Sequence, residues 1–285
     1  MEKQDLNIIE TSSIDVIEAS QRAEFDIQIM TAKRYPRDLK RIKDNCLAIV
    51  TMDKEIAASC RYALPRGGKS ISGPSVHLAR IIAQQYGNIR VDAKIKQVTD
   101  KQIVSEAVCF DLETNYACKV EVRRSIIGKT GRFNDDMITV TGNAANSIAF
   151  RNAVLNVVPK GITDLVYKAS MNVLTGDLTD EQKLVSARKK AFDYFKSEYN
   201  ISEEQVLNSM GLRSVNQVKS EQIADLRAMM QAIKDGDSTP EEMFNLKTEV
   251  KNPFEEQKTE NKEQPKNIEK NETDTGKLFP EGNQK

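Results

Sequence analysis

Between residues 89 and 126, apolar and polar residues alternate with a period of two, and this pattern constrains the fold most. The alternation from Ile89 to Lys96 predicts a half-buried strand, and a second strand is predicted at 102–110. A third covers 116–126, after a turn at Thr114-Asn115. Its apolar face would hold Tyr116, Cys118, Val120 and Val122, and its polar face Lys119, Glu121 and Arg123. Three consecutive strands with short turns predict an antiparallel meander with one solvent-exposed face.

Helical periodicity flanks the strands. Apolar spacing between Pro36 and Cys60 predicts one or two helices. Pro65 and Gly67-Gly68 predict a turn, and Pro74 fits the first position of the next helix, which Gly87 would end in a left-handed conformation. Further helices are predicted at 144–159, largely buried, and at 162–173, with a polar loop at 128–136 before them. This order predicts an α+β fold, an antiparallel β-meander packed by helices.

Pattern and composition divide the chain into four segments. Residues 1–30 form an N-terminal segment with some helical pattern, and 31–176 form the α+β core. A small helical C-terminal module is predicted at 180–244, with a helix start at Ser202, a break at Gly211 and an end at Gly236. Residues 245–285 are polar and proline-punctuated, which predicts a disordered tail.

The composition argues against several classes of protein. No apolar run reaches 18 residues, and the first residues lack the apolar centre of a signal peptide, so we expect a cytoplasmic protein without a membrane partner. The four cysteines fit no metal spacing and are expected to be reduced core residues. His77 is the only histidine, which argues against zinc sites and Ser-His triads, and its place in an amphipathic helix favours a structural or surface role over a catalytic one.

The charges are segregated although the net charge is zero. Residues 27–175 hold 23 Lys/Arg against 13 Asp/Glu, whereas residues 176–285 hold 17 against 22. This asymmetry predicts a basic region for a polyanion and an acidic portion that contacts proteins or moderates binding.

The segment Arg66-Gly-Gly-Lys-Ser70 resembles the end of a nucleotide-binding loop, but its surroundings do not fit. The loop requires glycine where Ala63 stands, and Pro65 removes a backbone donor. Ile71-Ser72-Gly73 also separate the lysine from the next helix, whose N-terminus should receive the phosphate. We therefore expect a basic turn that places Arg66 and Lys69 near a polymer's phosphates.

A nuclease site is also disfavoured. Strand 116–126 holds Lys119-Val-Glu121, the reverse of the usual Glu-x-Lys order on a strand. The remaining acids stand in turns and loops, where solvated carboxylates are the default: Asp111, Glu113, Asp135 and Asp136. We expect no catalytic residue, metal or cofactor, so the protein is predicted not to be an enzyme.

Nucleic-acid binding is better supported. The basic residues cluster at loops, turns and strand ends instead of on one recognition helix, which favours a groove that follows a single strand by its phosphates. The candidate contacts are Arg61, Arg66, Lys69, Arg90, Arg123, Arg124, Lys129, Arg132, Arg151 and Lys160. Tyr62 and Phe133 are candidate stacking platforms, and Phe150 is a third that could instead belong to the core.

Arg151 is the most informative of these residues. It stands in the small, apolar helical stretch Ala-Ala-Asn-Ser-Ile-Ala-Phe-Arg-Asn-Ala-Val-Leu, where a charge must pair with an acid or meet a ligand. The two alternatives are a structural salt bridge and a contact with nucleic acid.

The stretches "GPSVHLARIIAQQYGNIRVDAKI", "CKVEVRRSI" and "AANSIAFRNAVLNVVPKG" together resemble phage and prophage single-strand DNA annealing proteins. That superfamily includes Erf, RecT, the phage Sak proteins and the eukaryotic ring-forming annealing protein of double-strand-break repair. The resemblance covers about residues 35–175. In the family, a helix that ends in a glycine turn precedes a β-meander, and a later Ala-rich helix carries basic residues that face DNA.

The resemblance implies that Arg151 is the basic residue of the Ala-rich helix, and that Arg123 and Arg124 border the DNA groove. The eukaryotic proteins have adjacent basic residues in that helix, whereas Asn152 follows Arg151 here. The implied function is ATP-independent annealing of complementary strands during homologous recombination and DNA repair in a bacterial host. The implied partners are single-stranded DNA, further copies in a ring or filament, and, through the C-terminal region, a phage exonuclease and the host single-strand-binding protein.

Two alternatives of other classes remain at this stage. One is an ATP-dependent RecA-like recombinase, which would need the nucleotide loop argued against above. The other is a phage structural or assembly protein that does not bind DNA.

Overall fold

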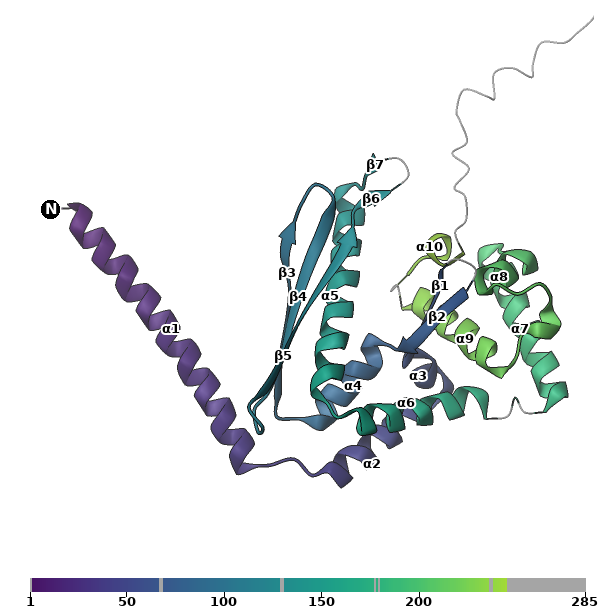
Figure 1. The fold of residues 1–285 in the computed structure, drawn as a ribbon, viewed down its shortest axis with the longest axis horizontal. Helices are drawn as coiled ribbons and strands as arrows, with labels where there is room; N and C mark the ends of the chain where they lie inside the picture. Colours follow the sequence, from purple (N-terminus) through teal and green to yellow (C-terminus); the bar gives the residue numbers. More distant parts are fainter. Residues whose placement is uncertain are drawn as a thin grey trace, which may run out of the picture. The chain divides into compact units, whose positions relative to one another are not determined.

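The chain is an α+β protein in the computed structural model, as the sequence predicted (Figure 1). The structure describes residues 2–66, 69–128, 131–176, 178, 180–235 and 238–244. The expectations for Gly67-Gly68, Lys129, Gly236 and the tail from 245 onward lie outside these residues.

The predicted meander is confirmed. Strands β3 (Ile89–Val98), β4 (Gln102–Asp111) and β5 (Tyr116–Ser125) form an antiparallel sheet in the order β3-β4-β5. Asn115 takes a positive φ of 58° in the turn between β4 and β5. One face packs against helices, and the other carries charged side chains, where the buried Glu106 carboxylate lies 3.1 Å from the Lys96 ammonium and 2.9 Å from that of Lys119.

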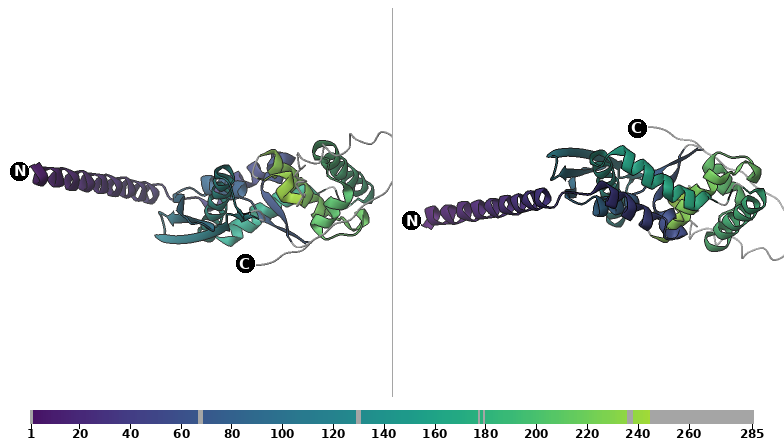
Figure 2. Two further views of the ribbon diagram at one scale, coloured as in Figure 1. Left: turned by 90° about the horizontal axis from the view of Figure 1, so that it is seen from above. Right: turned by 90° about the horizontal axis from the view of Figure 1, so that it is seen from below.

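Helix α5 (Asp135–Val157) covers the apolar face of this sheet (Figure 2). Ala145, Ala149 and Ala153 are fully buried, so the helix approaches the strands closely. The helix begins at Asp135 and not at the predicted residue 144, because the side chain of Asn134 accepts a hydrogen bond from the backbone N–H of Met137 and caps it. The prediction of a loop over 128–136 missed this start and the short strands β6 (Ile127–Gly128) and β7 (Gly131–Arg132).

A hairpin that the sequence reading missed precedes the sheet. Strand β1 (Arg61–Arg66) pairs antiparallel with β2 (Lys69–Pro74). Pro65 lies inside β1, since each strand of a two-stranded sheet has an unpaired edge that tolerates proline.

Pro74 ends β2, which corrects its prediction as the first helical residue of α4 (Val76–Tyr86). The hydroxyl of Ser75 caps α4 by accepting from the backbone N–H of Leu78 at 3.1 Å. Gly87 ends the helix with a positive φ of 63°, but its ψ of 177° lies outside the left-handed helical region that was predicted.

Three helices of the described chain precede the hairpin: two fall in the region between Pro36 and Cys60, where one or two were predicted, and the first spans the N-terminal segment, for which only some helical pattern was noted. They are α1 (Glu2–Arg34), α2 (Leu39–Val50) and α3 (Lys54–Ser59). Phe25 of α1 contacts Phe110 of β4 edge-to-face, with 5.1 Å between ring centroids. Arg37 binds Asp111 through two hydrogen bonds and stacks on Tyr86, and thereby ties the α1–α2 connection to the sheet.

Helix α6 (Lys160–Thr175) follows α5, and the helices predicted for 180–236 are confirmed. They are α7 (Glu181–Tyr199), α8 (Glu203–Met210), a 3-10 turn (Val215–Gln217) and α9 (Ser220–Lys234), followed by α10 (Pro240–Phe244). Ser202 and Gln205 form the capping box of α8, and Gly211 ends it in the left-handed region. The hairpin packs against these helices through Ala63, so contacts cross the boundary predicted between 176 and 180.

The cysteines behave as core residues. Cys46, Cys60 and Cys109 are buried, Cys118 is partly exposed, and all four are free thiols. Burial raises the pKa of Cys46 to about 11, and the pKa of both Cys60 and Cys109 to about 12.

Candidate nucleic-acid interface

The pleat of the β1–β2 hairpin divides its side chains between two faces. Arg61, Ala63 and Ser72 point toward the C-terminal helices, where Arg61 and Ala63 are buried. The opposite face carries Tyr62, Leu64 and Arg66 from β1, with Lys69 and Ile71 from β2. We call these five residues the outer hairpin face.

The outer hairpin face changes from apolar to positively charged toward the end of the hairpin. Leu64 lies opposite Ile71, and both are unusually exposed for apolar residues, at 37% and 49%. Arg66 and Lys69 form the last pair of the ladder, so two exposed cations follow the apolar pair. Arg66 lies four positions after Tyr62 in β1, which corresponds to about 13 Å at the usual strand rise of ~3.3 Å. The face is therefore long enough to contact more than one repeating unit of an extended polymer.

Arg151 of α5 joins this face at its base. Its guanidinium carbon lies 4.6 Å from the centroid of the Tyr62 ring, a cation–π geometry. Its Nε and Nη2 donate to the side-chain oxygen of Asn152 at 3.1 and 3.0 Å. The structure thus brings two predicted site residues, Tyr62 and Arg151, into direct contact.

Within the described part of the chain, no acid balances the charge of Arg151. No carboxylate of the described residues lies within ion-pair distance of it, which argues against the salt-bridge alternative. Burial lowers the pKa of Arg151 from its ordinary value, although a guanidinium remains charged at neutral pH. Its known partners are a neutral amide and an aromatic ring, so the site favours an anion supplied from outside.

The absence of a side chain at Gly73 leaves room for the ring of Tyr62. It lies opposite Tyr62 in the hairpin register, and a Cβ at Gly73 would stand 3.0 Å from a carbon of the tyrosine ring. The ring therefore lies across the glycine, beside Arg151.

Arg61 occupies a different environment from its neighbour Tyr62. Only 5% of its side chain is exposed, and its Nε and Nη2 bind the carboxylate of Asp225 in α9 at 2.7 Å. The same guanidinium donates to the hydroxyls of Tyr167 and Ser72, at 2.5 and 2.6 Å. The carboxylate of Asp225 neutralises the charge of Arg61 within the protein, so we do not include Arg61 in the interface.

The remaining basic candidates are distributed over the sheet and helix ends. Arg123 and Arg124 are adjacent in β5 and point to opposite faces; Arg123 is exposed and 3.0 Å from Glu121, whereas Arg124 is half-buried on the α5 side. Arg90, Arg132 and Lys160 each have an exposed acidic neighbour, Glu24, Asp100 and Asp164 respectively. Exposed pairs of this kind are weak and do not prevent a phosphate contact, but none lies in the outer hairpin face.

The other aromatic candidates pack against the protein interior. Phe133 contacts the cluster of Ile103, Ile126 and Ala145, and Phe150 packs against the core beneath α5. Of the three platforms considered, only Tyr62 belongs to the outer hairpin face.

Leu64 and Ile71 were missed by sequence reasoning. The alternation in Arg-Tyr-Ala-Leu-Pro-Arg carried a weak strand signal, but it was interpreted as a turn because of Pro65 and the two glycines. Lys69 also begins a strand, and the next helix begins only at Val76, so no helix N-terminus lies at the lysine.

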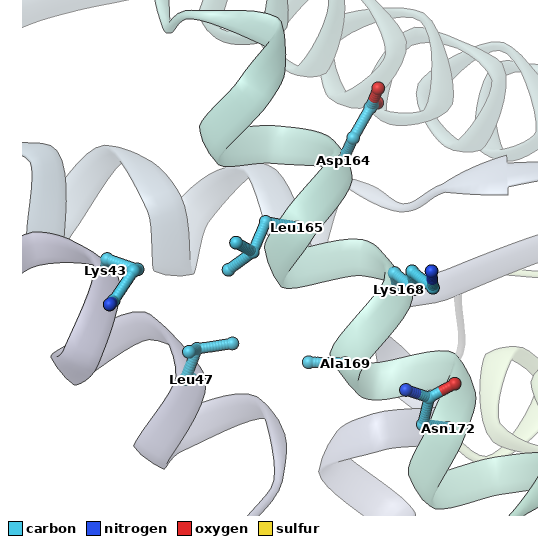
Figure 3. A pocket seen from close by; sticks show the side chains of 7 residues that line it. All are labelled: Lys43, Leu47, Asp164, Leu165, Lys168, Ala169 and Asn172. Atoms are coloured by element: carbon cyan, nitrogen blue, oxygen red, sulfur yellow. The ribbon is translucent and has the colours of Figure 1, made fainter.

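A second surface feature is an open hollow of about 470 Å³ between α2 and α6 (Figure 3). Leu47, Leu165 and Ala169 form its apolar part, with Lys43 and Lys168 beside them. Its lining lacks a group of acids or histidines, and among the described residues no cluster of three or more His, Cys, Asp or Glu could hold a metal. Within the same residues, no helix combines the length and apolar character needed to cross a bilayer.

Comparisons with family models, with curated proteins and with solved structures find no significant match to this chain.

Proposed function

We propose that this protein binds single-stranded DNA on the outer hairpin face and Arg151, and promotes annealing of complementary strands without ATP. The observation that carries the proposal is Arg151, a partly buried cation that lacks an acidic partner among the described residues and stacks on Tyr62. A phosphate placed beside this guanidinium would compensate its charge by charge-assisted hydrogen bonds.

The apolar pair supplies the second element of the proposed site. Leu64 and Ile71 lie between the cations of the hairpin end and Arg151, so bases can contact them while phosphates reach the charges on either side. Single-strand binders combine such a basic track with apolar or aromatic surfaces, because the faces of unpaired bases are accessible. In a duplex these faces are stacked, and only phosphates and groove edges are available.

Annealing requires little chemistry from the protein. If the strand is held mainly through its phosphates, its pairing edges remain available to a complementary strand. Such a protein needs neither nucleophile nor metal, and sequence preference should be low because phosphate contacts carry no base information. As part of the same proposal, several copies would share one strand in a ring or filament in the bacterial cytoplasm, and the C-terminal region would contact an exonuclease and the host single-strand-binding protein.

Two alternatives are less well supported. A RecA-like recombinase would need a phosphate loop followed by a helix, whereas Lys69 begins β2. An assembly protein that does not bind DNA would supply no anion for Arg151, which has no acidic partner among the described residues.

The test is binding of a labelled single-stranded oligonucleotide by fluorescence anisotropy, and annealing of complementary oligonucleotides, in EDTA and without nucleotide. With Arg66, Lys69 and Arg151 on phosphates, log affinity should fall with log salt with a slope of about −2, since each phosphate contact on a single strand contributes about 0.7. Affinity should then fall about 20-fold between ~50 and ~200 mM salt.

Matched variants assign the site. Arg151→Gln should weaken binding about tenfold and reduce the salt slope by about 0.7. Lys168→Gln removes an equal charge from the hollow between α2 and α6 and should leave binding unchanged. An absence of binding at low salt would exclude the proposal, and strict dependence on ATP would favour the RecA-like alternative.

A further inference from the structure

The structure points to a positioning role for the C-terminal helices: we infer that Asp225 of α9, acting through Arg61, holds the hairpin so that Tyr62 meets Arg151. Its consequence for DNA rests on the function proposed above, whereas the hairpin itself can be examined without DNA.

Arg61 is the first residue of β1 and directly precedes Tyr62. Its backbone belongs to β1, and its side chain passes to the face opposite Tyr62, where α9 contributes Asp225. Any displacement of the Arg61 backbone therefore displaces the Tyr62 ring directly.

The guanidinium connects elements that are far apart in the sequence. Asp225 lies 164 residues from Arg61, and Tyr167 of α6 lies 106 residues from it. Ser72 of β2 receives a third hydrogen bond, so a single side chain ties both strands of the hairpin to α6 and α9. Because Arg61 and Asp225 expose only 5% and 6% of their side chains, water cannot easily replace either partner.

Among the residues that the structure describes, few other polar contacts hold this face of the hairpin. Ala63 adds an apolar contact with the C-terminal helices, and Ser75 fixes the hairpin base by hydrogen bonds to the carbonyls of Ser59 and Cys60. The Arg61–Asp225 pair is thus the main specific link between β1 and α9.

The first experiment is amide hydrogen exchange of the full chain without DNA, compared between wild type and Asp225→Asn. The amide retains an acceptor for the Nε of Arg61 but loses the charge. We expect exchange in 61–66 and 69–74 to rise about tenfold or more, with little change in β3–β5. A general loss of stability would instead raise exchange in all elements together.

Glu221→Gln is the matched control. Glu221 precedes Asp225 by one helical turn and approaches the same guanidinium at 3.8 Å, but it is 73% exposed. Hairpin exchange in this variant should equal that of wild type. Unchanged hairpin exchange in Asp225→Asn would overturn the inference.

A second variant covers the case in which Asp225→Asn does not fold. Arg61→Gln with Asp225→Asn removes both charges together, so no lone charge stays buried. Glutamine cannot reach Tyr167 and Ser72 as the guanidinium does, so hairpin exchange should still exceed the wild-type rate. A wild-type rate in this double variant would also overturn the inference.

DNA binding gives an independent readout. Asp225→Asn should lower the affinity for the oligonucleotide about fivefold without altering the salt slope, because neither Asp225 nor Arg61 meets a phosphate. A slope reduced by about 0.7 in Arg61→Gln/Asp225→Asn would instead mean that Arg61 contacts DNA directly, against the inference. If the wild type does not bind DNA, the proposed function fails, while the exchange result still decides the positioning role.

Discussion

The guanidinium of Arg151 in α5 stacks on the ring of Tyr62 in β1, at 4.6 Å from its centroid. This contact joins the helix that covers the sheet to a hairpin that packs mainly against α8, α9 and α10. Several measurements can establish what this contact and its surroundings contribute.

Replacing Tyr62 tests the aromatic platform. Tyr62→Ala should weaken oligonucleotide binding about tenfold, because stacking on an aromatic ring contributes about 1–3 kcal/mol per base. Tyr62→Phe keeps the ring and its contact with Arg151, so its affinity should lie within about twofold of wild type. Anisotropy titrations at one salt concentration give the comparison; equal losses in both variants would assign the role to the hydroxyl.

A methyl group at Gly73 tests the geometry of the same ring. In Gly73→Ala the new Cβ would stand 3.0 Å from the tyrosine ring, so the ring must shift by a few tenths of an ångström, which alters its contact with Arg151. We expect a loss of affinity of about twofold to fivefold, smaller than for Tyr62→Ala, because the ring is displaced but not removed. Gly161→Ala is the control, since its Cβ would meet no atom within 4 Å; binding there should match wild type.

The Arg37–Asp111 pair should make the free energy of unfolding depend on pH in the acidic range. Burial opposes ionisation of Asp111, but hydrogen bonds from the guanidinium of Arg37 and the backbone of Glu113 leave its pKa below the ordinary value. A carboxyl whose pKa is lower in the folded state stabilises the fold above its unfolded pKa, about 4, and loses this contribution as pH falls through the folded value.

Asp111→Asn should therefore lower the free energy of unfolding at pH 7 by about 3 kcal/mol, because the buried Arg37 loses its bidentate partner and keeps only the carboxylate of Glu113, 3.3 Å from its Nε. Urea titrations should show that the difference from wild type shrinks below about pH 4. Asp44→Asn, which alters a carboxylate that is 54% exposed and 3.3 Å from Lys43, should change stability by less than about 1 kcal/mol at either pH. A constant difference for Asp111→Asn from pH 7 to pH 2 would contradict the assignment.

Thiol reactivity tests the burial of the cysteines. Cys118 is the partly exposed thiol and should react first with a chromogenic disulfide in the native protein at pH 8. Cys46, Cys60 and Cys109 should remain unreacted, since burial keeps their pKa at about 11 to 12 and blocks access. In denaturant all four should react at once. Rapid native reaction of more than one thiol would show that the core beneath α5 opens readily.

The sequence was sufficient for the meander, because the alternation from Ile89 onward leaves only one face that can be buried. It was insufficient for the hairpin, where Pro65 and two glycines dominate the local signal although the strand pairs on one side only. The start of α5 depended on the cap from Asn134, which periodicity does not reveal.

The candidate site was predicted only in part, because the sequence reveals residue types but not contacts between distant positions. Tyr62, Arg66, Lys69 and Arg151 were selected by charge and aromaticity, and the structure places them around one face. Arg61 was selected on the same grounds, but its partner Asp225 lies 164 residues away, and no local pattern reveals a contact of that range. The DNA-binding roles themselves remain predictions.

Because the side chains of β1 alternate between the buried face and the outer hairpin face, substitutions at neighbouring positions of this strand should have different effects. In a saturation screen scored separately for expression and for oligonucleotide binding, substitutions of Arg61 and Ala63 should lower both scores, whereas substitutions of Tyr62, Leu64 and Arg66 should lower binding alone. Two phenotypes would then alternate codon by codon within a single strand.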